Sequence, residues 1–532
     1  MILRCGVRDY PCFFVLFLEG KLKQEEINPI IRLDYPDPDV IRVDDVYYMV
    51  TTTMHFMPGC EILRSYDLVH WEHVTFVYDT LDGTSGQTLT GDQNIYGKGM
   101  WAASLRFYRG TYYICFVAND TGKTYLYTSE RIEGPWQKGH IEGFYHDASL
   151  LFDEENVYIA YGNKDIYITQ LKPDLSGPLE GGLHRLAVSD TGHPGLGYEG
   201  THFYKINGTY YLFFIHSLRG RWMRVQACFM ADSLEGEFTG GDVMVDDRGY
   251  CGQGVAQGGI VDTPDGAWYA MLFQDHGAVG RIPVLVPITW NGAYPEFGEK
   301  GMIPSEFCVP DGKTEYRYEP LVQSDDFRKE NGLSSAKEKE RYGCFGLKSV
   351  WQFNHEPELS LITIDDAIGM LWMKTGGLCK HLTQAKNTLT QRMCFPGCSG
   401  EVTVDASALE EGDYAGICAL QGCYGMVSLT KRNGYLCIVM KSKDSDSGDE
   451  TEWETVMIDQ SRVKLRIEVD FSEMKDEAKF FYYKDDAWKQ IGITQKLFFR
   501  LDHFTGCRFG LFLYATQKTG GRAGFQNFIY KT

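Results

Sequence analysis

The chain has 532 residues, enough for two or three domains, and 43% of them are hydrophobic and 14% aromatic. Its formal net charge of −20 argues against nucleic acid and against an anionic membrane surface as partners, because both bind basic patches. No apolar run approaches the roughly 18–20 residues that a membrane span requires.

The N-terminal residues and the cysteines bear on the compartment. The apolar run FFVLFL at residues 13–18 has no small-residue cleavage site after it, so a secretory signal is the weaker hypothesis. The 15 cysteines show no paired spacing, and most lie in apolar strand-like runs, as Cys115 and Cys418 do. We interpret them as reduced core thiols and expect a cytoplasmic protein whose residues 1–27 form a leader; secretion is the alternative.

A strand pattern recurs five times between residues 37 and 300. Each copy has an apolar run, a tight turn and a strand with an aromatic position: IRVDDVYYMV, LRFYRGTYYICFV, LLFDEENVYIAY, FYKINGTYYLFFI and GIVDTPDGAWYAMLF. A second strand-like half follows each copy, so each repeat can form a four-stranded blade. Repeats of this kind are typical of a propeller, and we predict five blades over residues 28–302.

One phase of the repeat carries unusual side chains. Eleven or twelve residues before the second aromatic position of each copy, the chain has Asp37, Trp101, Asp147, Glu199 and Gln257. Equivalent positions of a propeller lie at the same radius, so these five side chains should converge on one axial pocket. Each acid alone would suit a turn or a strand cap, but the shared phase favours a pocket. Three acids and an indole there indicate sugar chemistry.

The three acids match the needs of glycoside hydrolysis. Cleavage requires two carboxyl groups, one protonated to assist the leaving oxygen and one ionised. A third acid can raise the pKa of the proton donor by like-charge repulsion. Asp37, Asp147 and Glu199 could supply these parts. Asp39 lies in the same YPDPDV motif, but its phase and its expected place in an exposed turn make it a poorer candidate.

The second half of the chain has a different pattern. Residues 303–324 contain Pro304, Pro310 and several charges and are predicted to form a linker. Residues 325–532 continue as strands without the blade repeat, among them EVTVDA, YAGICALQ, RVKLRIEVD and CRFGLFLYA. The alternation of apolar and polar residues and the turn residues between the strands predict a β-sandwich. The expected fold class is therefore all-β, a five-bladed β-propeller followed by a β-sandwich.

Several segments match a known family in order. They are NPIIRLDYPDPDVIRVDDVYYMVTTT, MWAASL, HDASL, YEGTHFYKINGTYYL and FQDHGAVGRIPVLVPITW, followed by WQFNHEP, LTQRM, YAGICALQ and GGRAGFQNFIY. Together they resemble glycoside hydrolase family 43 with its accessory concanavalin-like sandwich. The resemblance implies an inverting enzyme in which Asp37 is the general base and Glu199 the general acid. It assigns to Asp147 the tuning of the donor's pKa.

The same resemblance suggests residues around the substrate. Trp101 matches a tryptophan that contacts sugar, unless its indole is structural, and Arg281 resembles an arginine that contacts sugar hydroxyls. Phe56 stands where the family often has an aromatic pocket wall, with core packing as the alternative. His276 is either a pocket residue or hydrogen-bonded in place. Phe504, in HFTG, is a candidate for a sandwich loop that reaches the pocket.

Two positions depart from the family pattern. Many relatives have His where this chain has Gln257, and that His helps to hold a central calcium or water. Because Gln is a weaker, neutral ligand, we expect no tightly bound axial calcium and no required cofactor, while a structural calcium stays open. Gln257 remains a candidate for substrate binding. Met54 stands where relatives often have Phe, so the resemblance does not fix the shape of the pocket.

These expectations combine into an exo-acting, inverting glycoside hydrolase that releases terminal xylose from β-1,4-xylo-oligosaccharides or xylosides. An α-L-arabinofuranosidase is the alternative, because xylopyranose and arabinofuranose can present similar hydroxyls. A non-catalytic carbohydrate-binding propeller is more remote, since all three acids are present. The expected partner is an oligosaccharide, and a homo-oligomer is compatible with the sequence.

Overall fold

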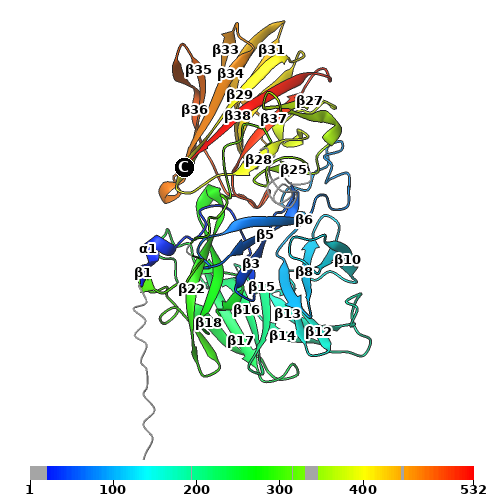
Figure 1. Cartoon of the computed structure of the whole chain (residues 1–532), viewed down its shortest axis with the longest axis vertical. Coiled ribbons are helices and arrows are strands. Elements are labelled where there is room, and N and C mark those ends of the chain that lie inside the picture. Colours follow the sequence, from blue (N-terminus) through cyan, green and yellow to red (C-terminus); the bar gives the residue numbers. More distant parts are fainter. Residues whose placement is uncertain (1–20, 193–194, 314, 330–344, 445–447) are drawn as a thin grey trace, which may run out of the picture.

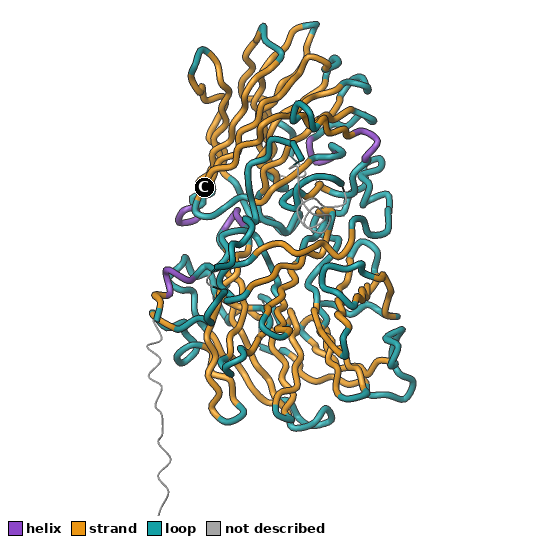
Figure 2. The backbone as a smooth tube through the Cα atoms, viewed as in Figure 1, coloured by secondary structure: helices purple, strands orange, loops and turns teal. Residues whose placement is uncertain are grey.

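The computed structural model describes residues 21–532 except 193–194, 314, 330–344 and 445–447. Two bodies lie end to end in Figure 1, with the first half of the chain below and the second half above. Strands dominate both bodies (Figure 2), and the expected all-β class is confirmed. The run at residues 13–18 lies outside the described residues. In the described part of the chain, no helix is long and apolar enough to cross a membrane.

Five antiparallel sheets form the five predicted blades. Blade 1 contains β2 (Asp39–Val43), β3 (Val46–Thr51), β5 (Gly59–Ser65) and β6 (Glu72–Tyr78). Blade 2 contains β7 (Ser104–Tyr108), β8 (Thr111–Ala118), β9 (Lys123–Ser129) and β10 (Gln137–Ile141). Blade 3 contains β11 (Ser149–Asp153), β12 (Asn156–Asn163), β13 (Asp165–Leu171) and β14 (His184–Ser189).

The last two blades complete the circle. Blade 4 contains β15 (Glu199–Ile206), β16 (Thr209–Ser217), β17 (Arg224–Ala231) and β18 (Thr239–Met244). Blade 5 contains β19 (Val255–Ala256), β20 (Ile260–Asp262), β21 (Trp268–Asp275), β22 (Arg281–Asn291) and β23 (Tyr294–Phe297), with the 3-10 turn η1 (Gly277–Val279) between β21 and β22. Blades 2, 3 and 4 pair their strands in the order of the sequence, as the repeat predicts, whereas β4 leaves blade 1 and both β19 and β20 pair with β21 in blade 5.

The N-terminal segment closes the propeller against blade 5. The N–H of Ile30 donates to the carbonyl of Pro283 over 3.2 Å, and the N–H of Tyr35 donates to that of Arg281 over 3.0 Å. The end of the expected leader forms β1 (Leu22–Lys23) and the short helix α1 (Gln24–Ile27). β1 pairs with β24 (Glu306–Phe307) of the expected linker, so both segments lie on the propeller.

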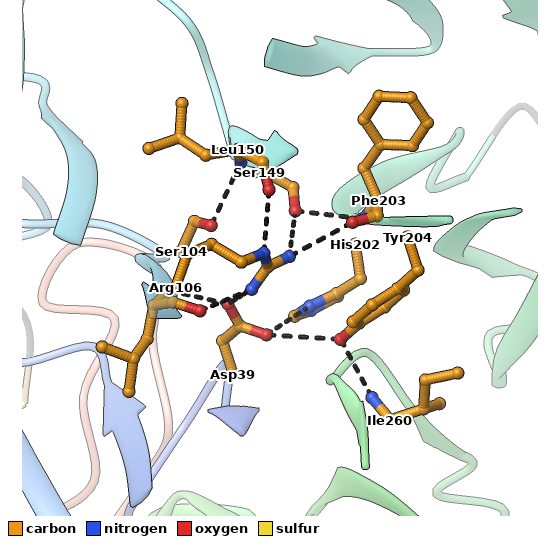
Figure 3. A network of polar contacts seen from close by, with 10 residues as sticks. Asp39, Ser104, Arg106, Ser149, Leu150, His202, Phe203, Tyr204 and Ile260 are labelled. Atoms are coloured by element: carbon orange, nitrogen blue, oxygen red, sulfur yellow. Dashed lines mark hydrogen bonds and ion pairs between the residues drawn. The ribbon is translucent and has the colours of Figure 1, made fainter. Parts of the chain in front are cut away.

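The innermost strands of all five blades meet in a buried polar network (Figure 3). Asp39 of blade 1 is fully buried and accepts hydrogen bonds from Arg106 of blade 2 over 2.6 Å and from the N–H of Leu105 over 2.8 Å. Its other carboxylate oxygen lies 3.1 Å from His202 Nδ1 of blade 4. Further bonds run from Arg106 to Ser149 of blade 3, and from the N–H of Ile260 in blade 5 to the hydroxyl of Tyr204.

This network corrects the expectation that Asp39 lies in an exposed turn. Burial would raise the pKa of Asp39, but the charge of Arg106 and the bond from His202 hold it below the ordinary value. Asp39 is therefore an ionised structural residue that holds the inner strands together.

Two packed sheets form the predicted sandwich. The first has the order β33 (Thr451–Ile458), β32 (Tyr435–Lys443), β31 (Tyr424–Arg432), β30 (Asp413–Leu420), β37 (Arg508–Ala515), β28 (Leu389–Arg392), β25 (Gln352–Asn354), β4 (Phe56–Met57). The second has the order β26 (Ile362–Asp365), β27 (Met370–Lys374), β38 (Arg522–Lys531), β29 (Gly397–Ala408), β34 (Arg462–Asp470), β35 (Glu477–Lys484), β36 (Ala487–Lys496). Three further 3-10 turns are η2 (Leu359–Leu361), η3 (Leu382–Gln384) and η4 (Ser472–Met474).

The sandwich is joined to the propeller by a shared sheet. β4 belongs in sequence to blade 1, yet it pairs with β25 and becomes the last strand of the first sandwich sheet. A second contact lies near the axis, where the N–H of Cys507 donates to the carbonyl of Ala278 over 2.8 Å. The N–H of Gly506 donates to the Asp34 carboxylate over 2.7 Å. The loop before β37 is thereby fixed against blade 5.

Candidate active site

The five phase-equivalent residues lie at the starts of the inner strands, on one face of the propeller. Asp37 and Asp147 each stand two residues before an inner strand, and Glu199 is the first residue of β15. Asp37, Asp147 and Gln257 have φ values of +53°, +47° and +57°. Such left-handed backbone is uncommon for residues other than glycine and is found both in tight turns and at functional sites. The same strained turn thus presents a polar side chain in three blades.

Asp37 is held by Arg281 from the opposite end of the propeller sequence. The Nη1 group of Arg281 donates to Asp37 Oδ1 over 2.9 Å, and the two residues are 2% and 7% exposed. The main chain of Arg281 is itself fixed, because its N–H donates to the Asp34 carboxylate over 2.7 Å. A charge-assisted bond of this kind fixes the orientation of the Asp37 carboxylate.

Glu199 and Asp147 form an acidic pair, with carboxylate oxygens within 4.8 Å of each other. Burial, and next the charge of Asp147, raise the pKa of Glu199 well above the ordinary value of a glutamate. Burial raises the pKa of Asp147 as well, while His146 acts in the opposite direction. The N–H of Gly200 also donates to Asp147 Oδ2 over 3.1 Å. These two neighbours stabilise the anion of Asp147, and Glu199 Oε2 accepts a 2.5 Å bond from Asn163.

Aromatic rings from both domains enclose the space beside these acids. The Trp101 indole lies 5.8 Å from the ring of Phe504 and 5.6 Å from that of His146. The Phe504 ring lies 4.4 Å from the guanidinium carbon of Arg281. The sandwich loop that carries Phe504 therefore reaches Trp101 and Arg281 of the propeller. Trp101 Nε1 and Arg281 Nε are buried donors without a hydrogen-bond partner among the described residues, so sugar hydroxyls could accept from both.

Gln257 lies against the backbone next to the acidic pair. A Cβ atom placed on Gly200 would come within 2.5 Å of Gln257 Cδ, so only glycine admits the Gln257 side chain here. The N–H of Gln257 donates to Gln226 Oε1 over 2.7 Å. The candidate side chain thus stands beside Glu199, as the phase predicts.

Phe56 and His276 lie at the junction of the two domains. Phe56 is 2% exposed and packs 3.4 Å beneath the guanidinium carbon of Arg508. His276 stacks on Tyr250 at 4.2 Å and contacts the ring of Phe395 in the sandwich at 4.7 Å. Burial and the nearby Arg248 lower the pKa of His276 to about 3. These positions fit the alternatives stated for both residues, packing for Phe56 and a fixed, neutral ring for His276.

Sequence reasoning missed residues that come from outside the repeated phase. Asn163 ends β12 and bonds Glu199, and Arg224 begins β17 and pairs with Asp275 over 2.9 Å. Asp34 fixes both Arg281 and the Phe504 loop. These residues lie at strand ends and in connections that follow no common spacing. A single sequence carries no signal that would separate them from ordinary turn residues.

One group of three residues in the described chain could hold a metal ion. The ligand atoms of His146, Asp147 and Glu199 lie within 4.8 Å of one another. Two of the three belong to the acidic pair, so an ion there would compete with the proton of Glu199. The structure does not test the expectation of a site without axial calcium, which stays a prediction.

Two family models and several curated relatives match this chain. The sequence model described as Glycosyl hydrolases family 43 matches residues 27–294, and that of the beta xylosidase C-terminal concanavalin A-like domain matches residues 345–531. A beta-xylosidase from Formosa agariphila is 25% identical over 95% of this chain and 90% of its own length. A non-reducing end alpha-L-arabinofuranosidase from Bacteroides ovatus is 25% identical over 76% of each chain.

A solved structure shows the same two-domain arrangement. The bifunctional GH43-CE protein of Bacteroides eggerthii is 40% identical to this chain, with a TM-score of 0.86 over 96% of it. This chain spans 64% of that protein, which is therefore considerably longer.

Proposed function

This chain belongs to glycosyl hydrolases family 43 and is a glycoside hydrolase, and from that premise we propose that it releases terminal xylose from β-1,4-xylo-oligosaccharides or xylosides, with inversion. The observation that carries the proposal is the contrast between two acid environments in one pocket. Glu199 stands beside Asp147 with a raised pKa, whereas Asp37 is bound to Arg281. This contrast supplies a proton donor and an ionised acid.

In the proposed reaction, each acid acts on one side of the bond. The Asp37 carboxylate takes a proton from a water molecule as that water attacks the anomeric carbon. The bond to the glycosidic oxygen breaks, and Glu199 delivers its proton to that oxygen. The products are a free sugar and either the shortened oligosaccharide or the alcohol of the xyloside. Asp37 and Glu199 then exchange protons with water and return to their starting states.

Two features support action at the chain end. Phe504 and Trp101 enclose the space next to the acids, and the sandwich loop is fixed by the Gly506–Asp34 bond. A pocket closed on one side admits a terminal sugar more readily than the middle of a chain. The unpartnered donors of Trp101 and Arg281 would bind hydroxyls of that sugar.

The arabinofuranosidase alternative has support from a relative. The Bacteroides ovatus protein is named a non-reducing end alpha-L-arabinofuranosidase, and it matches most of this chain. Initial rates on p-nitrophenyl β-D-xylopyranoside and p-nitrophenyl α-L-arabinofuranoside, measured side by side, distinguish the two. We expect the higher kcat/KM on the xyloside; the opposite order would assign the pocket to arabinofuranose.

We further propose that the chemistry requires no metal or cofactor, because two carboxyl groups suffice for the bond cleavage. We also propose a reducing compartment such as the cytoplasm. The twelve cysteines in the described residues are all free thiols, and nine of them are buried. Such usage is typical of proteins that do not meet an oxidising environment.

A further inference from the structure

Blade 4 carries a loop on the same face as the acids. β15 begins at Glu199, and Glu199 pairs with Ile215 near the end of β16. β17 begins at Arg224, which pairs with Ser217, the last residue of β16. Because these strands are antiparallel, the connection at residues 218–223 lies at the end of the blade where Glu199 stands. We call this connection the blade-4 loop.

The blade-4 loop exposes one large aromatic ring. Trp222 is 55% exposed, whereas Met223 beside it is buried. The loop is closed by a 2.9 Å bond from the N–H of Leu218 to the carbonyl of Met223. It also packs on the segment that leads into Glu199, since a Cβ atom on Gly195 would lie 3.7 Å from the Trp222 ring. Trp222 therefore presents an indole on the face of the propeller where the acids stand, and an indole there is suited to stacking on a sugar ring.

A row of alternating charges and rings connects Trp222 with the acids. The guanidinium carbon of Arg224 lies 5.9 Å from the Trp222 ring and 5.2 Å from that of Phe273. The guanidinium carbon of Arg281 lies 5.4 Å from the same Phe273 ring. Arg281 binds Asp37, and the charge of Arg224 acts on the carboxyl of Glu199. Arg224 is 9% exposed, so Trp222 forms the outer rim of this wall.

We propose that Trp222 binds the sugar unit on the leaving-group side of the scissile bond, a β-linked pyranose, by stacking on the apolar C–H face of its ring. The inference rests on the proposed function. A terminal sugar between Trp101 and Phe504 leaves the next unit to extend from the acids toward the rim. A planar indole matches the flat face of a xylopyranose, and its exposed position costs the free enzyme no rearrangement.

The test compares leaving groups with and without a sugar ring. In Trp222→Ala, the ratio of kcat/KM on xylobiose to kcat/KM on methyl β-D-xylopyranoside should fall about tenfold relative to the wild type, on the order of one stacked aromatic contact. Trp222→Phe should restore most of the ratio. Trp453→Ala is the matched control, because Trp453 is 46% exposed on β33, the edge strand of the sandwich in Figure 1, and its ratio should be unchanged.

If the wild-type protein cleaves xylobiose and the ratio is unchanged in Trp222→Ala, the inference is overturned and the proposed function stands. If the wild-type protein cleaves only arabinofuranosides, the proposed substrate is wrong. The same ratio is then measured with arabinofuranosyl-xylobiose and methyl α-L-arabinofuranoside. A tenfold fall of this ratio in Trp222→Ala would support the Trp222 site, and the same ratio in the variant and the wild type would overturn it.

Discussion

Arg281 binds Asp37 although 244 residues separate them in the sequence, and the bond spans the closure of the propeller from blade 5 to blade 1. The N–H of Arg281 is held by Asp34, whose other carboxylate oxygen holds the sandwich loop at Gly506. Arg281, which binds Asp37, and the loop that carries Phe504 are thus both held by the buried Asp34 carboxylate. Closure of the ring and docking of the sandwich both contribute to the geometry of the site.

Replacing Asp37 by Asn should abolish most activity without unfolding the protein. Asn retains an oxygen that can accept from Arg281, but it cannot take a proton from water. General base catalysis contributes about 10²–10⁴-fold, and loss of the only base can exceed that. The measurement is kcat on xylobiose, with circular dichroism to verify the fold. Asp45→Asn on the same blade is the control, since that side chain is 66% exposed. A kcat near wild type would remove Asp37 from the role of base.

Replacing Asp147 by Asn should move the basic limb of the pH–rate profile to lower pH. Glu199 must be protonated to act, so activity falls as the pH rises through its pKa. Burial and the charge of Asp147 raise that pKa, and an asparagine side chain in its place would carry no charge, so the pKa of Glu199 should fall. The measurement is kcat/KM against pH. If the limb does not move, Asp147 only positions its neighbours.

The sequence singled out the acids because they share one position of the repeat in three of the five blades. Asp37, Asp147 and Glu199 stand at or just before the start of an inner strand, and this places them on one face of the propeller. Asp39 was expected in an exposed turn, but it is the first residue of β2, and Arg106 and His202 from two other blades bury its carboxylate. The spacing of the repeat does not predict which side chains of other blades will form hydrogen bonds or ion pairs with a buried charge.

The position of Phe56 depends on a contact with the sandwich, which the repeat pattern of the propeller does not predict. The loop between β3 and β5 forms β4 and joins a sheet of the sandwich, and this takes Phe56 to the domain junction. The sequence predicts each domain from its own strand pattern. Docking depends on the shapes of the two surfaces, which no local pattern describes.

Replacing Phe504 by Ala should weaken substrate binding more than it slows the chemistry. The Phe504 ring contacts both Trp101 and Arg281, so its loss would open one wall of the pocket and admit water. We expect KM for xylobiose to rise about tenfold, with a smaller change in kcat. Phe498→Ala is the matched control, because Phe498 is 40% exposed and its ring contact is Arg500. Equal effects of the two variants would place Phe504 outside the pocket.

Chelation of divalent metals should leave turnover intact. The proposed reaction transfers protons between water and two carboxyl groups, and neither step needs a Lewis acid. Gln257, beside Gly200, also offers a weaker ligand than the histidine of many relatives. The measurement is kcat after prolonged dialysis against EDTA, with the melting temperature recorded in parallel. Loss of activity that Ca²⁺ restores would show that the axial site holds an essential ion.

The reaction should invert the anomeric configuration. Water activated by Asp37 attacks the face opposite the leaving group, while Glu199 protonates that group, so a β-xyloside should release α-xylose first. Proton NMR within the first minutes, before mutarotation, separates the two anomers. Methanol added to the reaction should give no methyl xyloside, because no covalent intermediate exists to be intercepted. If β-xylose appears first, or if the methyl glycoside forms, Asp37 acts as a nucleophile. In that case Asp37 attacks the anomeric carbon in the first step, and water enters only in the second.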